Sequence, residues 1–245
     1  MKGFIDIHSH ILPYLDDGSQ SLEQAIDILE QAYNEGIGTI IATPHFYEGI
    51  FDNTKLKIEE ALLLLEQVMN EKNIEIDIKI GCEVYYSHDI CKFLNEGLIP
   101  TMNGTRYILV EFAPMEAYRN IKNGLMHLIY NGYQPILAHG ERYDDLIMDL
   151  DKVRELIKMG VRIQVNADSV IGKFGRRYYK VTKRLIKYNL VHYIASDTHN
   201  SSTRRPSLKK AYSMIAKKYG NNYARSLFID NPSELIINEQ VMQKI

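Results

Sequence analysis

Four junctions in this chain share one pattern, in which a helix-forming stretch stops at a glycine or an asparagine and a strand-forming stretch begins within a few residues. The stopping residues are Gly36, Gly132, Gly160 and Asn189. Glycine and asparagine reach the left-handed backbone conformation of a helix C-cap more readily than other residues do. Repeated alternation of helix and strand is typical of α/β proteins whose parallel strands are joined by helices. The pattern therefore predicts an α/β fold.

The alternation predicts seven strands. They are expected at about residues 3–7, 39–43, 74–83, 107–110, 135–138, 161–165 and 192–196. Helices are expected at about residues 21–35, 53–71, 89–95, 116–131, 149–159 and 176–188, with a helical tail from Ser207 onward. The apolar run from Leu62 to Leu65 suggests that the second helix is buried on more than one side.

A doubly wound open sheet and a closed barrel would both satisfy this alternation. Polar residues follow strands throughout the chain, which requires the carboxyl ends of the strands to converge around one mouth, as in a barrel. We therefore expect a closed, seven-stranded (β/α) barrel. The 245 residues, 45% of them hydrophobic, suffice for one large core, so a single domain over residues 1–245 is expected.

Composition excludes several classes of protein. The formal charge is -2, with lysines interspersed among glutamates, so no overall basic field attracts nucleic acid. Cys82 and Cys91 are too few for a disulfide framework, which fits a reducing compartment. Asp6 and His8 interrupt the only apolar run near the N-terminus, and no stretch is apolar enough to cross a membrane. We expect a cytoplasmic protein without direct membrane insertion.

Histidines and carboxylates follow the strands at regular intervals. His8 and His10 come after the first strand and project from the same face, since alternate residues of a strand share a face. Glu83, Glu111 and His139 follow the third, fourth and fifth strands, 28 residues apart. The full candidate set is His8, His10, Asp17, His45, Glu83, Glu111, His139, Asp197 and His199.

The composition of this set indicates a metal centre. Nitrogen and carboxylate donors without thiolates suit manganese, iron, zinc or magnesium rather than a closed structural zinc site. Nine candidates exceed what one tetrahedral ion can use, so two or three ions fit better. Crowded carboxylates repel one another unless cations lie between them. Such a cluster can activate water and hold both ends of a phosphoryl transfer, which is the chemistry of a hydrolase.

Arginines near the same strand ends indicate the substrate class. Arg142 lies three residues after His139, and Arg204 and Arg205 follow His199. The planar guanidinium group matches phosphate oxygens and the charge that develops during transfer. A phosphate ester is therefore the expected substrate.

Other candidates have plainer interpretations. His127 in a helix and His192 at the start of the last strand are expected to be structural, whereas His88 lies close enough to the mouth to contact a substrate. Asp17 could simply begin an Asp-Gly turn, and Lys173 with the basic helix at 176–188 could be a solvated face or a surface for a phosphorylated or acidic partner.

Cysteine-based phosphatase chemistry is disfavoured. A C-x5-R loop needs arginine at the sixth residue after cysteine, but His88 follows Cys82 and Gly97 follows Cys91 at that distance.

Several motifs together resemble the bacterial protein-tyrosine phosphatases of the PHP superfamily that are associated with capsule and exopolysaccharide synthesis. The motifs are Asp6-Ile7-His8-Ser9-His10, Leu15-Asp16-Asp17-Gly18-Ser19, Ala42-Thr43-Pro44-His45, Gly81-Cys82-Glu83-Val84, Leu109-Val110-Glu111-Phe112, Leu137-Ala138-His139-Gly140-Glu141-Arg142-Tyr143, Gly172-Lys173-Phe174-Gly175 and Ala195-Ser196-Asp197-Thr198-His199-Asn200. They cover nearly the whole chain up to about Pro206.

The resemblance implies a PHP-type, distorted TIM-like barrel with a manganese-preferring site of three ions, where Fe, Mg, Co or Zn could substitute. It implies hydrolysis of phosphotyrosine by a metal-activated hydroxide, typically on the tail of a bacterial tyrosine autokinase that regulates polysaccharide export. The nine candidates above would be the metal ligands. Arg142 and Arg204 would bind phosphate and stabilise the transition state.

The chain departs from the family pattern at two places. Gly140 stands where the family usually has proline, which should loosen the loop that carries Arg142. The doubled arginine makes the register ambiguous, so Arg205 is an alternative to Arg204. A PHP-type histidinol phosphatase, or another small-molecule phosphoesterase, is the main rival function. A non-catalytic metal-binding regulator at a membrane kinase is a further alternative.

Overall fold

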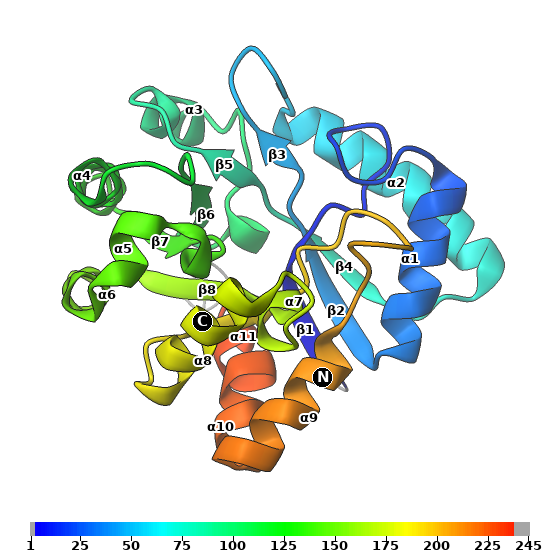
Figure 1. Ribbon diagram of the computed structural model, residues 1–245. Coiled ribbons are helices and arrows are strands. Elements are labelled where there is room, and N and C mark those ends of the chain that lie inside the picture. The colour runs from blue at the N-terminus through cyan, green and yellow to red at the C-terminus, as the bar shows by residue number, and fades with distance from the viewer. Residues whose placement is uncertain (1–2, 238–245) are drawn as a thin grey trace, which may run out of the picture.

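Parallel strands form the centre of the molecule, and helices lie around them (Figure 1). The computed structural model describes residues 3–237, so both ends of the expected domain 1–245 lie outside the described residues. The strands are β1 (Phe4–Ser9), β2 (Ile37–Ala42), β3 (His45–Phe46), β4 (Asp77–Ile80), β5 (Glu83–Tyr85), β6 (Tyr107–Glu111), β7 (Gln134–Leu137), β8 (Arg162–Asn166) and β9 (Tyr193–Ala195).

The helices follow the expected order. They are α1 (Leu22–Asn34), α2 (Lys55–Lys72), α3 (Ile90–Asn95), α4 (Tyr118–Tyr130), α5 (Asp144–Met148), α6 (Leu150–Lys158), α7 (Ala167–Val170), α8 (Arg176–Lys187), α9 (Leu208–Tyr219), α10 (Asn221–Arg225) and α11 (Asn231–Ser233). No helix within residues 3–237 is both long enough and apolar enough to cross a membrane.

The expected α/β alternation is confirmed, but the strands number nine within the described residues and lie in two sheets. One sheet has the order β1-β2-β4 and the other β3-β5-β6-β7-β8-β9, with parallel pairing throughout. The second expected strand, at 39–43, corresponds to β2, and the additional strand β3 begins at His45, after Pro44, which lacks a backbone N–H for the ladder. The third is interrupted between Ile80 and Glu83. The expected count of seven strands is therefore not confirmed.

Backbone hydrogen bonds also join the two ends of the strand order. The N–H of Asp197 donates to the carbonyl of His8 at 2.8 Å, and the N–H of His10 donates to the carbonyl of Thr198 at 2.8 Å. The last strand segment thus lies against the first. The parallel sheet curls, and the carboxyl ends of its strands surround one mouth.

The four predicted junctions adopt the expected backbone conformation. Gly36, Gly132 and Gly160 have φ values of 82°, 87° and 102°, and Asn189 has a φ of 54°. These values lie in the left-handed region that allows a helix to stop and the chain to turn into the next strand. The glycine and asparagine residues from which the α/β fold was predicted therefore stand where the backbone requires a positive φ.

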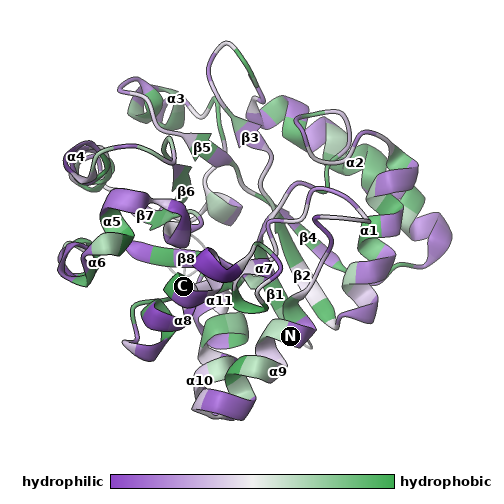
Figure 2. Cartoon of the chain, viewed as in Figure 1, coloured by the Kyte–Doolittle hydropathy of each residue, from purple (hydrophilic) through white to green (hydrophobic). Residues whose placement is uncertain are grey.

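Helix α2 is buried on one side only, so the expectation of wider burial was wrong. Leu63 and Leu64 are 60% and 41% exposed, whereas Ile58, Leu65 and Met69 are buried. The helix contacts the core along a single stripe, and part of the leucine run falls outside it. Figure 2 shows the hydrophobic residues gathered on the strands and on the inner faces of the helices.

Candidate metal centre and phosphate-binding site

His8 and His10 meet at the end of β1. Both side chains are fully buried, and their Nε2 atoms lie 3.2 Å apart. Oε2 of Glu83, at the start of β5, lies 3.0 Å from Nε2 of His8 and 3.2 Å from Nε2 of His10. Oδ1 of Asp197 lies 3.5 Å from Nε2 of His8. The two imidazoles therefore point into a space that two buried carboxylates also face.

A second part of the cluster lies around Glu111. Nδ1 of His45 is 3.2 Å from oxygens of both Glu83 and Glu111. Nε2 of His139 is 2.9 Å from Oε1 of Glu83 and 3.5 Å from Oε2 of Glu111. Glu83 thus contacts four histidines, which are His8, His10, His45 and His139.

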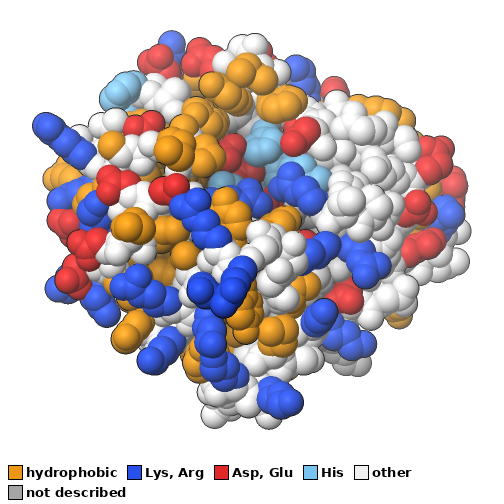
Figure 3. All heavy atoms as spheres, viewed as in Figure 1, with side chains coloured by type: hydrophobic (Ala, Val, Ile, Leu, Met, Phe, Trp, Pro, Cys, Tyr) orange, Lys and Arg blue, Asp and Glu red, His pale blue; other side chains and the backbone are white. Residues whose placement is uncertain are grey.

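Asp17 and His199 complete the set at its outer edge. Nε2 of His199 lies 3.3 Å from Oδ1 of Asp17, and Nε2 of His45 lies 3.5 Å from the same oxygen. Asp17 is the most exposed of the candidate ligands, with 56% of its side chain accessible. Figure 3 shows histidine and carboxylate atoms together in a hollow of the surface, with Lys and Arg atoms beside them.

Three groups of these side chains have ligand atoms close enough to share an ion. They are His10, Asp17, His45 and His199; His8, His10 and Asp197; and His45, Glu83 and Glu111. His139 joins through Glu83 and Glu111. The structure therefore brings together all nine residues that the spacing singled out.

The donor chemistry fits divalent metal ions. Imidazole nitrogens and carboxylate oxygens are suitable ligands for manganese, iron and zinc. Nδ1 of His10 lies 2.7 Å from Oδ2 of Asp16 and donates to it, so only Nε2 of His10 remains for a metal. His10 can consequently serve one of its two groups, not both.

The pKa values within the cluster indicate that its buried carboxylates need positive charge beside them. Burial alone would raise the pKa of Glu83, but His8, His45 and His10 hold it well below its usual range. Burial alone would lower the pKa of His139, but the contacts with Glu111 and Glu83 raise it to about 9. Without metal, protons on imidazoles balance the carboxylates, and a divalent cation supplies the same charge while leaving the imidazoles neutral.

Both predicted arginine loops reach Asp197. Nη2 of Arg142 donates to Oδ2 of Asp197 at 3.2 Å, and Nη2 of Arg204 donates to Oδ1 at 2.8 Å. The side chain of Arg205 lies elsewhere and lines a separate cavity. The geometry therefore favours Arg204 over Arg205 as the residue at the centre.

The family model described as "Capsular polysaccharide synthesis, CpsB/CapC" matches residues 4–237. The chain belongs to the CpsB/CapC family. The resemblance drawn from the motifs is thereby confirmed.

Relatives cover almost the full length of this CpsB/CapC chain. Tyrosine-protein phosphatase CpsB of Streptococcus pneumoniae is 40% identical over 242 residues, covering 97% of this chain and 100% of that protein. Tyrosine-protein phosphatase YwqE of Bacillus subtilis is 30% identical, covering 98% of this chain and 94% of that protein.

Solved structures agree with this assignment. A chain from the crystal structures of YwqE and CpsB, described as unique metal-dependent tyrosine phosphatases, superposes with a TM-score of 0.89 at 31% identity, covering 95% of this chain and 94% of that one. Histidinol phosphate phosphatase of Lactococcus lactis reaches a TM-score of 0.57 at 17% identity, covering 88% of this chain and 93% of that one, which is a likeness of fold.

Asp16 is a site residue that sequence reasoning missed in this CpsB/CapC protein. Its side chain is buried, Oδ2 accepts from Nδ1 of His10, and the same oxygen accepts from the N–H of His45 at 2.8 Å. Oδ1 accepts from the N–H of Gly18 at 2.8 Å. Asp16 therefore orients one ligand and fixes the backbone of another.

Gln164 and Asn166 on β8 form a second network that was not predicted. Oε1 of Gln164 accepts from the N–H of His139 at 2.7 Å and lies 3.3 Å from Nδ1 of His8. Nδ2 of Asn166 donates to Oδ2 of Asp197 at 2.7 Å. Two amides that alternate within an apolar strand share the face toward the site, and that alternation was the available signal.

Two residues of the centre have unusual backbone conformations. His139 has a φ of 34° and Asp197 a φ of 55°, values that L-residues adopt rarely. Such conformations persist where surrounding contacts fix them, and they gather at functional sites. Both residues stand at the end of a strand, where the chain turns sharply to aim the side chain into the mouth.

The loop that carries Arg142 is anchored despite Gly140. Glu141 is fully buried, and its Oε1 accepts from the N–H of Asn166 at 3.0 Å and from Oγ of Ser169 at 2.6 Å. The guanidinium of Arg142 lies 5.3 Å from the ring centroid of Phe174, a cation–π distance. These contacts hold the loop that carries Arg142 in place. That Gly140 loosens this loop stays a prediction.

The remaining histidines lie outside the nine-residue cluster. Nδ1 of His192 accepts from the N–H of Ile163 at 3.0 Å, and Nδ1 of His127 lies 3.2 Å from Oη of Tyr86, so both have local partners. His88 lines a cavity of about 640 Å³ together with Tyr86 and His127.

Proposed function

We propose that this protein is a metal-dependent protein-tyrosine phosphatase that hydrolyses phosphotyrosine. The carrying observation is the convergence of Arg142 and Arg204 on the two oxygens of Asp197, inside a cluster of five histidines and further carboxylates. Guanidinium groups that lie against a candidate ligand are placed to bind the oxygens of a phosphate held there. The names of relatives at 40% and 30% identity, both tyrosine-protein phosphatases, support the same activity.

The metal ligands in this proposal are the nine residues of the cluster, which hold three ions, with manganese as the physiological metal. When bound, such ions lower the pKa of a coordinated water and neutralise charge on the phosphoryl group. Iron, magnesium, cobalt or zinc can take the same donor set. The three groups of ligand atoms within reach of one another support the count of ions.

The chain's own residues bind and orient the substrate. Arg142 and Arg204 leave Asp197 for the phosphate oxygens, and their positive charge stabilises the transition state. Neither cysteine takes part, because Cys82 is buried, its pKa is raised by that burial, and its thiol donates to the carbonyl of Pro44. Hydrolysis therefore proceeds without a covalent cysteine intermediate.

The substrate in this proposal is the phosphorylated tail of a bacterial tyrosine autokinase that controls capsular or extracellular polysaccharide synthesis. The CpsB/CapC family description supports the pathway. The enzyme acts in the cytoplasm, where its two free cysteines stay reduced. We also propose that residues 1–245 form a single PHP-type phosphatase domain whose curled strands amount to a seven-stranded barrel.

The deciding experiment compares a phosphotyrosine peptide with histidinol phosphate, each with manganese and after chelation. Metal-dependent hydrolysis that favours the peptide is the expected result. Preference for histidinol phosphate would keep the fold and the metal ligands but replace the substrate, as the likeness of fold to the Lactococcus lactis enzyme allows.

A non-catalytic role is tested separately. The double variant His10→Ala, Asp197→Ala removes ligands from two of the three groups. The group formed by His45, Glu83 and Glu111 is left intact. Loss of regulation of the kinase in cells that carry this variant is expected. Regulation that survives the loss of metal would point to a binding protein instead.

A further inference from the structure

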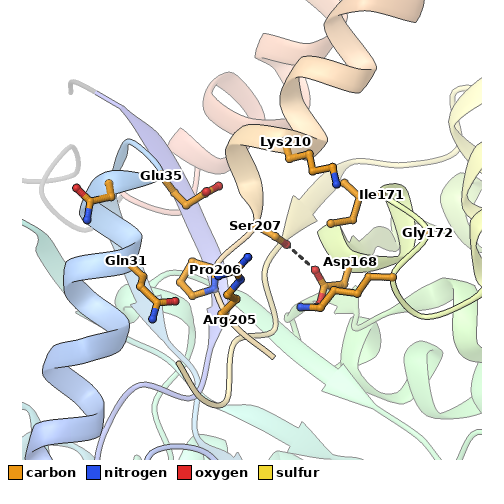
Figure 4. A pocket seen from close by; sticks show the side chains of 11 residues that line it. Gln31, Glu35, Asp168, Ile171, Gly172, Arg205, Pro206, Ser207 and Lys210 are labelled. Carbon is orange, nitrogen blue, oxygen red and sulfur yellow. Dashed lines mark hydrogen bonds and ion pairs between the residues drawn. The ribbon is translucent and has the colours of Figure 1, made fainter. Parts of the chain in front are cut away.

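A polar cavity of about 520 Å³ lies on the far side of the segment that carries Arg204. Figure 4 shows Glu35 at the end of α1, Asp168 in α7 and Lys210 in α9 around this hollow, with Arg205 between them. Lys173 and Ser207 also line it. None of these six residues belongs to the nine-residue metal cluster, so the cavity is distinct from the centre described above.

The acidic groups of the cavity already have partners. Asp168 is 1% exposed, its Oδ1 accepts from Oγ of Ser207 at 2.7 Å, and its Oδ2 lies 2.9 Å from Nζ of Lys173. Oε2 of Glu35 accepts from the N–H of Lys209 in the first turn of α9 at 2.9 Å. These two carboxylates are therefore not free to bind a cation.

Two cationic side chains of the cavity have no such partner. Within residues 3–237, the side chains of Arg205 and Lys210 form no ion pair and no hydrogen bond, although both line the cavity. Both residues are exposed, and guanidinium and ammonium groups are hydrogen-bond donors without an acceptor atom. The cavity also holds an unpaired acceptor, Oε1 of Gln31, but its unpaired charged groups are both positive, which favours an anionic ligand.

Adjacent residues connect this cavity to the active centre. Arg204 donates to Asp197 in the centre, whereas the side chain of the next residue, Arg205, lines the cavity. A residue before proline favours the extended backbone conformation, in which consecutive side chains point to opposite sides, and Arg205 precedes Pro206. A single ligand with two anionic groups can therefore lie across residues 204–205 and reach both sites.

The second arginine loop borders the same cavity. Lys173, which pairs with Asp168, immediately precedes Phe174, whose ring lies under the guanidinium of Arg142. Asp168 thus links the segment beneath Arg142 to Ser207, just beyond Arg204 and Arg205. The contacts of Asp168 therefore join the cavity to both segments that carry the arginines of the centre.

We propose that this cavity binds a second anionic group of the peptide substrate, a carboxylate or a phosphate, while the phosphotyrosine to be hydrolysed occupies the metal centre. The inference rests on the proposed function, because it takes the substrate to be a peptide. Arg205 and Lys210 are the residues that bind the second group, and they give the enzyme a preference for acidic or multiply phosphorylated segments.

The test measures binding rather than turnover. Each peptide carries a phosphonate analogue of phosphotyrosine that is not hydrolysed. One series has neutral flanking residues, a second has glutamate at each of three positions on either side, and a third has a second phosphonate. Their Kd values are measured with the manganese-loaded full chain at low salt. Inorganic phosphate is added in a separate arm, which distinguishes a free anion from a group on the peptide.

The expected result is a threefold to tenfold tighter Kd, an order of magnitude set by about two exposed charge pairs, for one or both anionic series. The preference should disappear in Arg205→Gln and Lys210→Gln and weaken at high salt. Lys209→Gln is the matched control, because its side chain is exposed on the same turn and does not line the cavity.

Several outcomes would overturn the inference. Equal Kd values for neutral and anionic peptides would do so, as would a preference that survives in both Arg205→Gln and Lys210→Gln. Inorganic phosphate that binds in an Arg205-dependent way without any preference among peptides would show a free-anion site instead. A peptide that binds with this preference but whose phosphotyrosine counterpart is not hydrolysed would contradict the proposed function alone.

Discussion

Oδ2 of Asp16 lies 2.7 Å from Nδ1 of His10 and also accepts from the backbone N–H of His45 at 2.8 Å. One buried carboxylate therefore fixes two histidines that come from different strands. Burial would raise the pKa of Asp16, but the contact with His10 lowers it, so Asp16 is ionised at neutral pH. An ionised partner selects the tautomer of His10 that presents Nε2 to a metal.

We expect Asp16→Asn to weaken metal binding by about 10-fold to 100-fold, the usual cost of losing a carboxylate behind a ligating histidine. The measurement is manganese retention in competition with a chelator. Asp27→Asn, an exposed position on α1, is the control. An unchanged competition curve for Asp16→Asn would remove Asp16 from the metal centre.

Arg142→Ala should keep the fold and the metal content and lower kcat/KM for a phosphotyrosine peptide. The expected loss is about 100-fold, equivalent to about 3 kcal/mol of transition-state stabilisation, by analogy with removal of one donor to a developing anion. Steady-state kinetics with metal analysis of the same samples measures both quantities. Turnover at the wild-type level would exclude Arg142 from phosphate binding.

Arg204→Ala and Arg205→Ala test which of the doubled arginines serves the centre. Arg204 contacts Asp197 whereas Arg205 lines the neighbouring cavity, so Arg204→Ala should reduce kcat on a small aryl phosphate far more than Arg205→Ala does. A small ester carries a single phosphate and reports on the centre. Equal losses in the two variants would contradict the assignment made from the structure.

Much of this fold was predictable because its signals are local. A glycine or asparagine at a helix end needs only its own backbone freedom, and Gly36, Gly132, Gly160 and Asn189 all have the predicted positive φ. The short strands β3 and β5 were harder to predict, because they pair in one sheet while β2 and β4, which precede them in the chain, pair in the other. Leu63 and Leu64 were predicted to be buried but are exposed, because hydrophobicity alone does not say which side of a helix meets the core.

The candidate site was predictable where its residues follow strands, and it was not predictable where their role depends on contacts between strands. Side chains that follow parallel strands converge because the topology brings strand ends together, so the regular spacing selected Glu83, Glu111 and His139. Asp16 and Gln164 escaped because their role depends on contacts between strands, such as the bond from His139 to Gln164. The preference for Arg204 over Arg205 likewise depends on the direction of two adjacent side chains.

His192 should make stability depend on pH away from the metal centre. Burial, together with the nearby Arg162, lowers the pKa of His192 to about 4, against about 6.5 in the unfolded chain. The unfolded state therefore binds the proton first as the pH falls, and stability is lost between about pH 6.5 and pH 4. The expected contribution is about 2 kcal/mol less favourable at pH 5 than at pH 7.

The variant that isolates this effect is His192→Asn, because asparagine can still accept from the N–H of Ile163, as Nδ1 of His192 does at 3.0 Å. Denaturant unfolding at pH 7 and pH 5, with the chelated protein in both cases, gives the change in free energy for each protein. Subtracting the variant from the wild type cancels the titration of the metal ligands, which both share. A pH dependence of the same size in both proteins would show that His192 does not take up a proton on unfolding in this pH range.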